Sequence, residues 1–128
     1  MCLYDSTDSS SHSPIIGWAL DGYPIYGPFG YSSANDSSSS IKRLLPSYSL
    51  RTYANNQRTS LANGTVLSSD YYGPNVNSTY YLGYYLQDYQ YDGSGDLDEY
   101  NGRWCVTPEY PSGTYAYFIA TNSRFIFI

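Results

Sequence analysis

The chain has 128 residues, a formal net charge of −5 and 24 aromatic residues, 18 of which are tyrosine. The negative charge disfavours binding to the phosphate backbone of nucleic acids, and no span of about 20 apolar residues is present to cross a membrane. Because only 13% of the residues are charged while aromatic residues are abundant, the composition is typical of an extracellular β protein and excludes a disordered chain. The length predicts a single domain over residues 1–128.

The first distinctive stretch, residues 12–31, predicts two extended segments joined by a tight turn. Residues 15–20 form a short apolar run bounded by turn formers, which predicts a buried strand. Asp21-Gly22 follows at once and is typical of a hairpin turn. Residues 23–28 are expected to be extended, because a residue before proline avoids the α region.

The middle of the chain predicts little regular structure. Residues 32–40 are rich in serine and are expected to form a mobile loop. Residues 41–45 could form one short helical turn that ends at Pro46. Residues 48–53 alternate well enough to predict a strand, whereas residues 54–79 predict a loop with at most one short hairpin.

The last third predicts two further strands. Residues 80–91 hold the densest tyrosine spacing and predict a strand because of their aromatic enrichment, and residues 113–121 give the clearest strand pattern after the first. The expected fold class is therefore mainly β: a single-domain antiparallel sheet or sandwich with long irregular loops and at most one short helix.

The chain has two cysteines, enough for one disulfide, and three glycosylation sequons, all in turn-like polar stretches. Cys2 and Cys105 are expected to form one disulfide, with pairing of Cys2 to a residue upstream of Met1 as the alternative. The sequons predict glycosylation at Asn35, Asn63 and Asn77. Because no signal peptide is present, a secreted protein would have lost it or would carry it upstream, and the abrupt start suggests a fragment.

One acidic loop could hold a metal ion. Its carboxylates, within eight residues and beside two glycines, suit the six to eight oxygen ligands of Ca²⁺, although their spacing is not that of an EF-hand. The alternative is a solvated turn, or carboxylates that cap a turn and pair with Arg103. The candidate metal ligands are Asp92, Asp96, Asp98 and Glu99.

His12 and Asp21 could form a catalytic base and its orienting carboxylate. No recognisable nucleophile accompanies them, so the alternative is that Asp21 bonds the turn backbone and His12 packs beside Pro14. Zinc is disfavoured, because one histidine and two distant cysteines lack the spacing of a ligand pair.

A run of tyrosines could form a stacking surface for sugar rings or for another protein, because tyrosine supplies contact area at low entropic cost. The alternative is a strand with one face in the core and one face exposed. These tyrosines are Tyr80, Tyr81, Tyr84, Tyr85, Tyr89 and Tyr91.

The motifs HSPIIGWALDGYPIYGP, SYSLR and GDLDEYNGRWCVTPEYPSGTYAYFIAT resemble the YHYH-domain family of secreted proteins, best over residues 12–31 and 83–121. This resemblance implies an extracellular, mainly β module and no established activity. The Tyr-His-Tyr-His motif of the family is absent, and Tyr100 stands where relatives often have Cys or His. We therefore expect the chain to begin after that motif, and no role of the missing histidines is carried over.

Two classes of function follow from these patterns. The first is a non-catalytic extracellular module for structure, adhesion or assembly, which binds protein subunits or carbohydrate. The apolar end at residues 125–128 suits pairing with a neighbouring subunit. The second is a Ca²⁺- or transition-metal-dependent binding protein or hydrolase that uses Asp21, Asp98 and Glu99.

Overall fold

The computed structural model describes residues 9–121 and 126–127, and the chain groups into two compact units. The sheet unit comprises the described residues up to Ser47 and from Gly93 onward, and the loop unit comprises Tyr48–Asp92. Both consist of short strands and irregular segments, and the helical segments among the described residues are three-residue 3₁₀ turns. The mainly β fold is confirmed, while a single domain over residues 1–128 stays a prediction.

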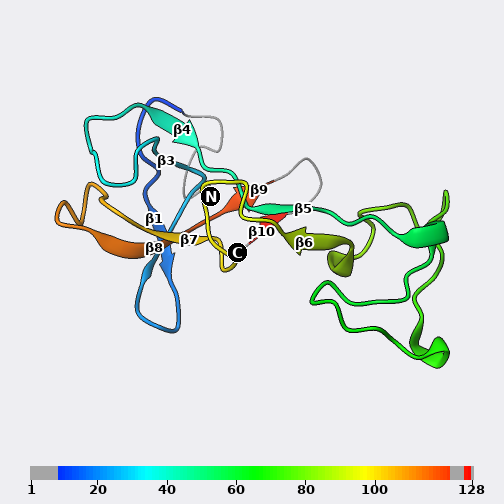
Figure 1. Cartoon of the computed structure of the whole chain (residues 1–128). Helices are drawn as coiled ribbons and strands as arrows, with labels where there is room; N and C mark the ends of the chain where they lie inside the picture. The colour runs from blue at the N-terminus through cyan, green and yellow to red at the C-terminus, as the bar shows by residue number, and fades with distance from the viewer. Residues whose placement is uncertain (1–8, 122–125, 128) are drawn as a thin grey trace. The chain divides into compact units, whose positions relative to one another are not determined.

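The sheet unit is built around a four-stranded sheet in the order β1-β2-β8-β7. Its strands are β1 (Ile15–Trp18), β2 (Pro24–Tyr26), β7 (Gly102–Cys105) and β8 (Thr114–Phe118). β1 and β2 are antiparallel, β2 and β8 are parallel, and β7 and β8 are antiparallel. In Figure 1 the blue strands from the start of the chain therefore lie beside the orange strand from its end.

The predicted turn between the first two strands is confirmed. Gly22 has a φ of +89°, a backbone conformation that glycine adopts without strain. The backbone N–H of Tyr23 donates to the Asp21 carboxylate at 3.1 Å, so Asp21 serves the turn. The first strand is shorter and more exposed than the apolar run predicts, because Trp18 is 58% exposed at the edge strand β1.

The core of the sheet unit is apolar and lies on one face of this sheet. Along β8 the side chains of Thr114, Ala116 and Phe118 are buried, while Tyr115 and Tyr117 point to the other face and are half-buried. Phe118 stacks on Tyr26 of the neighbouring strand with ring centroids 5.4 Å apart. Both of these aromatic side chains are almost completely buried.

The expected helical turn at residues 41–45 is wrong. β4 (Ile41–Arg43) instead pairs antiparallel with β3 (Phe29–Tyr31). A five-residue segment forms too few intrahelical hydrogen bonds to offset nucleation, whereas the neighbouring strand supplies partners at once. The intervening serine-rich loop is closed by a 2.7 Å bond from the Ser32 N–H to the Ser40 carbonyl. Its mobility stays a prediction.

Close to the end of the chain, β10 (Ile126–Phe127) pairs antiparallel with β9 (Ala120–Thr121). Part of the apolar end expected to contact a neighbouring subunit thus pairs within its own chain, and residues 125 and 128 lie outside the described residues.

The loop unit has one strand pair, β5 (Tyr48–Leu50) with β6 (Tyr89–Tyr91). The small hairpin expected within residues 54–79 is present as a bridge between Ser60 and Val66. The three 3₁₀ turns, η1 to η3, are Ala54–Asn56, Ser69–Tyr71 and Leu86–Asp88.

The strand expected over residues 80–91 is wrong except for its last three residues. Asp88 explains the difference, because its carboxylate accepts the backbone N–H groups of Gly83 at 3.0 Å and Tyr85 at 3.1 Å. These bonds fold the segment back on itself, and Gly83 adopts a φ of +98°. Hydrogen bonds from the backbone to the Asp88 side chain here take the place of the backbone hydrogen bonds that a strand would form with its neighbour.

Buried charge dominates the interior of the loop unit. Asp88 and Arg58 are 0% and 6% exposed and form an ion pair with a distance of 2.8 Å. Arg51 is buried beside them and donates to the carbonyls of Ser60 and Gln87. Among the described residues of the whole chain, no helix has the length and apolar character needed to cross a membrane.

Candidate functional site

The outer face of the four-stranded sheet carries a group of aromatic side chains that we call the aromatic face: Tyr23, Trp104, Tyr115 and Tyr117. Tyr115 and Tyr117 project from β8, and Trp104 lies directly opposite Tyr115 in the register of β7. Tyr23 precedes β2 and lies on the same side. Trp104 is 67% exposed, so most of its indole is accessible to solvent on this face.

The rings of the aromatic face fix one another in place. The centroid of Tyr115 lies 5.4 Å from Tyr23, 6.1 Å from Trp104 and 5.2 Å from Tyr117. The interplanar angles of 70°, 65° and 89° are those of edge-to-face contacts. Such contacts contribute about 0.5–1.5 kcal/mol each, so the rings stabilise one another's orientation.

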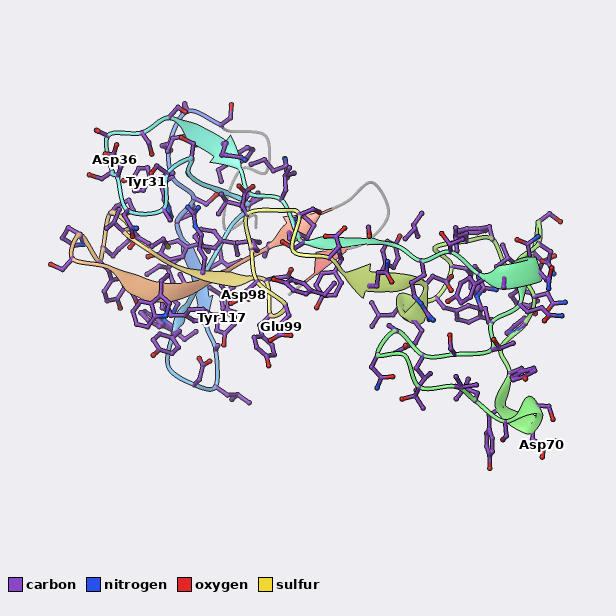
Figure 2. The ribbon with its side chains drawn as sticks, viewed as in Figure 1. Tyr31, Asp36, Asp70, Asp98, Glu99 and Tyr117 are labelled. Carbon is purple, nitrogen blue, oxygen red and sulfur yellow. The ribbon has the colours of Figure 1, made fainter. Side chains whose placement is uncertain are left out.

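Two carboxylates hold the tyrosine hydroxyls of this face. Tyr115 donates its hydroxyl to Asp98 at 2.5 Å, and Tyr117 donates its hydroxyl to Asp21. The other oxygen of Asp98 accepts the backbone N–H groups of Tyr100 at 2.9 Å and Gly102 at 3.0 Å. Figure 2 shows Asp98 and Tyr117 near each other in the sheet unit.

A glycine makes the Tyr115–Asp98 bond possible. A Cβ atom at Gly102 would lie 2.5 Å from the Tyr115 hydroxyl oxygen and 3.0 Å from the carbonyl of Ala116. The Tyr115 ring therefore passes over β7 at the one position without a side chain, and any larger residue would displace it.

The hydrogen bonds set the charge of the aromatic face. The bond from Tyr117, together with the Tyr23 N–H, lowers the pKa of the Asp21 carboxyl from its usual value. The same bond to Asp21 raises the pKa of Tyr117 to about 12, with burial as a smaller cause. The pKa of Tyr115 is raised as well, mainly by burial and to a smaller extent by the hydrogen bond to Asp98. At neutral pH Tyr115 and Tyr117 are thus neutral phenols, and Asp21 beside Tyr117 is ionised.

The predicted metal ligands serve the protein's own backbone and side chains where contacts are described. Asp96 pairs with Lys42 at 2.9 Å and accepts the Leu45 N–H at 2.8 Å, and Asp98 is bonded as described above. These carboxylates therefore cap a turn, as the alternative interpretation expected. The cation that pairs with Asp96 is Lys42, whereas Arg103 donates to the Tyr31 carbonyl. Over residues 9–121 and 126–127, no three His, Cys, Asp or Glu side chains gather as a metal site would require. A site that uses Asp92 or Glu99 stays a prediction.

His12 and Asp21 contact different residues. The His12 ring packs on the buried side of the sheet, with centroids 4.9 Å from Tyr26 and 5.0 Å from Tyr31. Burial lowers the pKa of His12, and its Nδ1 lies 2.8 Å from the Ser13 carbonyl. Asp21 is exposed at the β1–β2 turn, so the structure does not bring this pair together as an acid–base couple.

The tyrosines predicted as a binding surface divide into two groups. Tyr89 is 7% exposed and Tyr91 is 48% exposed on β6. The other four form a cluster in a turn, not a row on a strand. Four pairs of these rings have centroids 4.8–6.2 Å apart, and the cluster consists of Tyr80, Tyr81, Tyr84 and Tyr85.

The sequon asparagines Asn35, Asn63 and Asn77 are all exposed in irregular segments, where a glycan could be accommodated. Cys105 is a buried thiol whose pKa is raised by burial. Cys2 lies outside the described residues, so the disulfide between these two cysteines stays a prediction.

None of the four residues of the aromatic face was singled out by the sequence interpretation. A signal existed, because the alternation in residues 114–118 places Tyr115 and Tyr117 on one side of a strand. The link from Tyr117 to Asp21 spans 96 positions, and no local pattern predicts it.

Comparison with known proteins supplies the family. A model of the YHYH protein family matches residues 1–127. The curated proteins contain no match to the chain, and neither do the solved structures. The match extends over almost the whole chain, which confirms the resemblance carried by the motifs at residues 12–31 and 83–121. The chain therefore belongs to the YHYH protein family.

Proposed function

We propose that the chain is a non-catalytic extracellular binding module whose aromatic face takes neutral carbohydrate. The observation that carries this proposal is the exposed indole of Trp104, 67% exposed and held against Tyr115. Pyranose rings have an apolar face of C–H groups that stacks on such rings. Tyrosine and tryptophan suit this contact because each combines an apolar body with a polar tip.

Carboxylates beside the rings supply the polar half of such a site. An ionised carboxylate offers about four acceptor positions. Asp98 receives three bonds from the protein and Asp21 receives two, so acceptor capacity remains for sugar hydroxyls. Because their tyrosine partners also fix their orientation, little conformational entropy is lost on binding.

The charge of the chain favours a neutral sugar. A net charge of −5 and the carboxylates of the face repel uronic acids and sulfated polymers. The low content of charged residues and the exposed sequon asparagines support an extracellular location.

The test is retention on a panel of neutral polysaccharides by affinity electrophoresis, which should include β-glucan, xylan, mannan and chitin fragments. We expect retention on at least one polymer and a loss of at least about tenfold in affinity for Trp104→Ala, since truncation of an aromatic anchor costs about 2 kcal/mol or more.

Trp18→Ala is the matched control. Trp18 is 58% exposed and lies opposite Pro24 in the β1–β2 register. Pro24 is on the same face of β2 as the buried Tyr26, so Trp18 lies on the face of the sheet opposite to the aromatic face. Retention of the wild type by no polymer, or equal losses in both variants, would contradict the proposal. A stoichiometric metal lost on Asp98→Asn would instead support the metal-dependent class.

A further inference from the structure

A second site lies in the loop unit and is independent of the aromatic face. It is a cavity of about 200 Å³ whose walls are mainly tyrosine rings and leucine side chains. The residues that define it are Tyr53, Arg58, Leu61, Leu67, Tyr71 and Tyr85.

Arg58 gives the cavity a charged residue that cannot bind an anion. Its Nε and Nη2 donate to the two oxygens of Asp88, both at 2.8 Å. Its Nη1 donates to the Pro74 carbonyl at 2.8 Å, and the carbonyls of Tyr80 and Tyr81 accept the remaining N–H groups at 3.2 Å. All five donors are thus engaged within the protein, and an anionic ligand finds none available.

The same guanidinium also excludes a cation. Its central carbon lies 5.0 Å from the ring centroid of Tyr85 and 5.6 Å from that of Tyr53. The ring faces turned toward Arg58 are therefore not available to stack on a ligand cation, and burying any ligand charge against mainly apolar walls without a partner costs desolvation free energy. The cavity selects against either sign of charge.

The size of the cavity sets the size of the ligand. An apolar protein cavity of about 150 Å³ holds one benzene molecule, so about 200 Å³ accommodates a single substituted ring. A sugar ring would place several hydroxyl groups against mainly apolar walls, where Ser60 and Gln87 are polar side chains of the lining, and each hydroxyl left buried and unsatisfied costs about 1–3 kcal/mol.

We propose that this cavity binds an uncharged small molecule with one aromatic ring, of the phenol or benzyl alcohol class. The ligand ring contacts Tyr71 and the edges of Tyr53 and Tyr85, whose faces are covered by Arg58, and Leu61 and Leu67 complete the apolar wall.

The test is an NMR titration of the full chain with benzyl alcohol, benzylamine and benzoate, which share one ring and differ in charge. Saturable shifts confined to residues around the cavity are expected for benzyl alcohol, with a dissociation constant on the order of 1 mM, and binding at least tenfold weaker for both charged probes. Methyl glucoside should produce no shifts there.

Variants at the rim give the structural control. Tyr71, 76% exposed, lines the cavity, whereas its neighbour Tyr72, 48% exposed, does not. Tyr71→Ala is expected to weaken benzyl alcohol binding about tenfold and Leu67→Phe to abolish it by filling the space, while Tyr72→Ala leaves it unchanged.

Equal binding of the three probes, equal effects of Tyr71→Ala and Tyr72→Ala, tighter binding of methyl glucoside, or no saturation would overturn the proposal. Trp104→Ala should retain benzyl alcohol binding, so failure of this site and failure of the carbohydrate proposal are distinguishable.

Discussion

The two units of this chain are stabilised in different ways. The sheet unit buries aromatic and aliphatic side chains, with Tyr26, Leu44 and Phe118 at or below 1% exposed. The loop unit places Arg58 and Asp88 at its centre, where the sheet unit has apolar groups. The difference teaches that a segment with little apolar material can still be ordered when one carboxylate organises the surrounding backbone. The same segment is then vulnerable wherever that carboxylate loses its charge or its partner.

Loss of the buried ion pair should produce the largest effect. Asp88→Asn leaves Arg58 as an uncompensated buried charge, which costs about 3–5 kcal/mol. We expect faster amide hydrogen exchange throughout residues 48–92. Both tryptophans, Trp18 and Trp104, lie in the sheet unit, so the midpoint of urea unfolding followed by their fluorescence should stay near the wild-type value. A uniform increase in exchange over both units would contradict this localisation.

A steric change in the sheet unit should have the next largest effect. Gly102→Ala introduces a Cβ atom 2.5 Å from the Tyr115 hydroxyl oxygen and 3.0 Å from a backbone carbonyl. Overpacking of this kind costs about 1–3 kcal/mol. We expect a lower urea midpoint by tryptophan fluorescence together with weaker polysaccharide retention, since Tyr115 must leave Asp98. Unchanged stability with unchanged retention would show that the ring does not depend on the glycine.

Acid should destabilise the two units in different pH ranges. Burial alone would raise the pKa of Asp88, but hydrogen bonds from Arg58, Tyr53 and two backbone N–H groups outweigh it and lower the pKa to about 2, from 3.8. Its contribution of about 2 kcal/mol is therefore complete above pH 3.8 and is lost as the pH falls through about 2.

His12 acts at higher pH. Its folded-state pKa is lowered from 6.5, so its contribution to stability is complete above pH 6.5 and decreases as the pH falls below that value. Tryptophan fluorescence in urea at successive pH values should report this loss for the sheet unit, and His12→Phe should remove it. The amide protection factors of the loop unit, which correct for the intrinsic pH dependence of exchange, should fall only near pH 3.8 and below; a fall near pH 6 would contradict the assignment.

The smallest effect is expected for the ion pair between Lys42 and Asp96, whose side chains are 38% and 21% exposed. Lys42→Met should cost about 0–1 kcal/mol, because solvent screens the pair. The loss of unfolding free energy for Lys42→Met, compared with that for Asp88→Asn, measures how much more a buried ion pair contributes than an exposed one. A loss for Lys42→Met as large as that for Asp88→Asn would contradict it.

The sequence predicted those features that depend on neighbouring residues. The Asp21-Gly22 turn, the strand within residues 113–121 and the short hairpin after residue 54 follow from local chemistry, and the structure contains them. The segments at 41–45 and 80–91 were misassigned, because partners distant in sequence or a side-chain acceptor decided their conformation. Sheet pairing brings Tyr23, Trp104, Tyr115 and Tyr117 together in the aromatic face, and tyrosine hydroxyls link it to Asp21 and Asp98. These contacts join residues far apart in sequence, so no local spacing rule predicts them.

The measurement that tests the carbohydrate proposal most directly is a fluorescence titration of two single-tryptophan variants with oligosaccharides from the retained polymer. Trp18→Phe keeps only the indole of Trp104 on the aromatic face, and Trp104→Phe keeps only Trp18 on the opposite side of the sheet. The account predicts a saturable change in emission for Trp18→Phe and none for Trp104→Phe. A saturable change confined to Trp104→Phe, or no change in either variant, would contradict it.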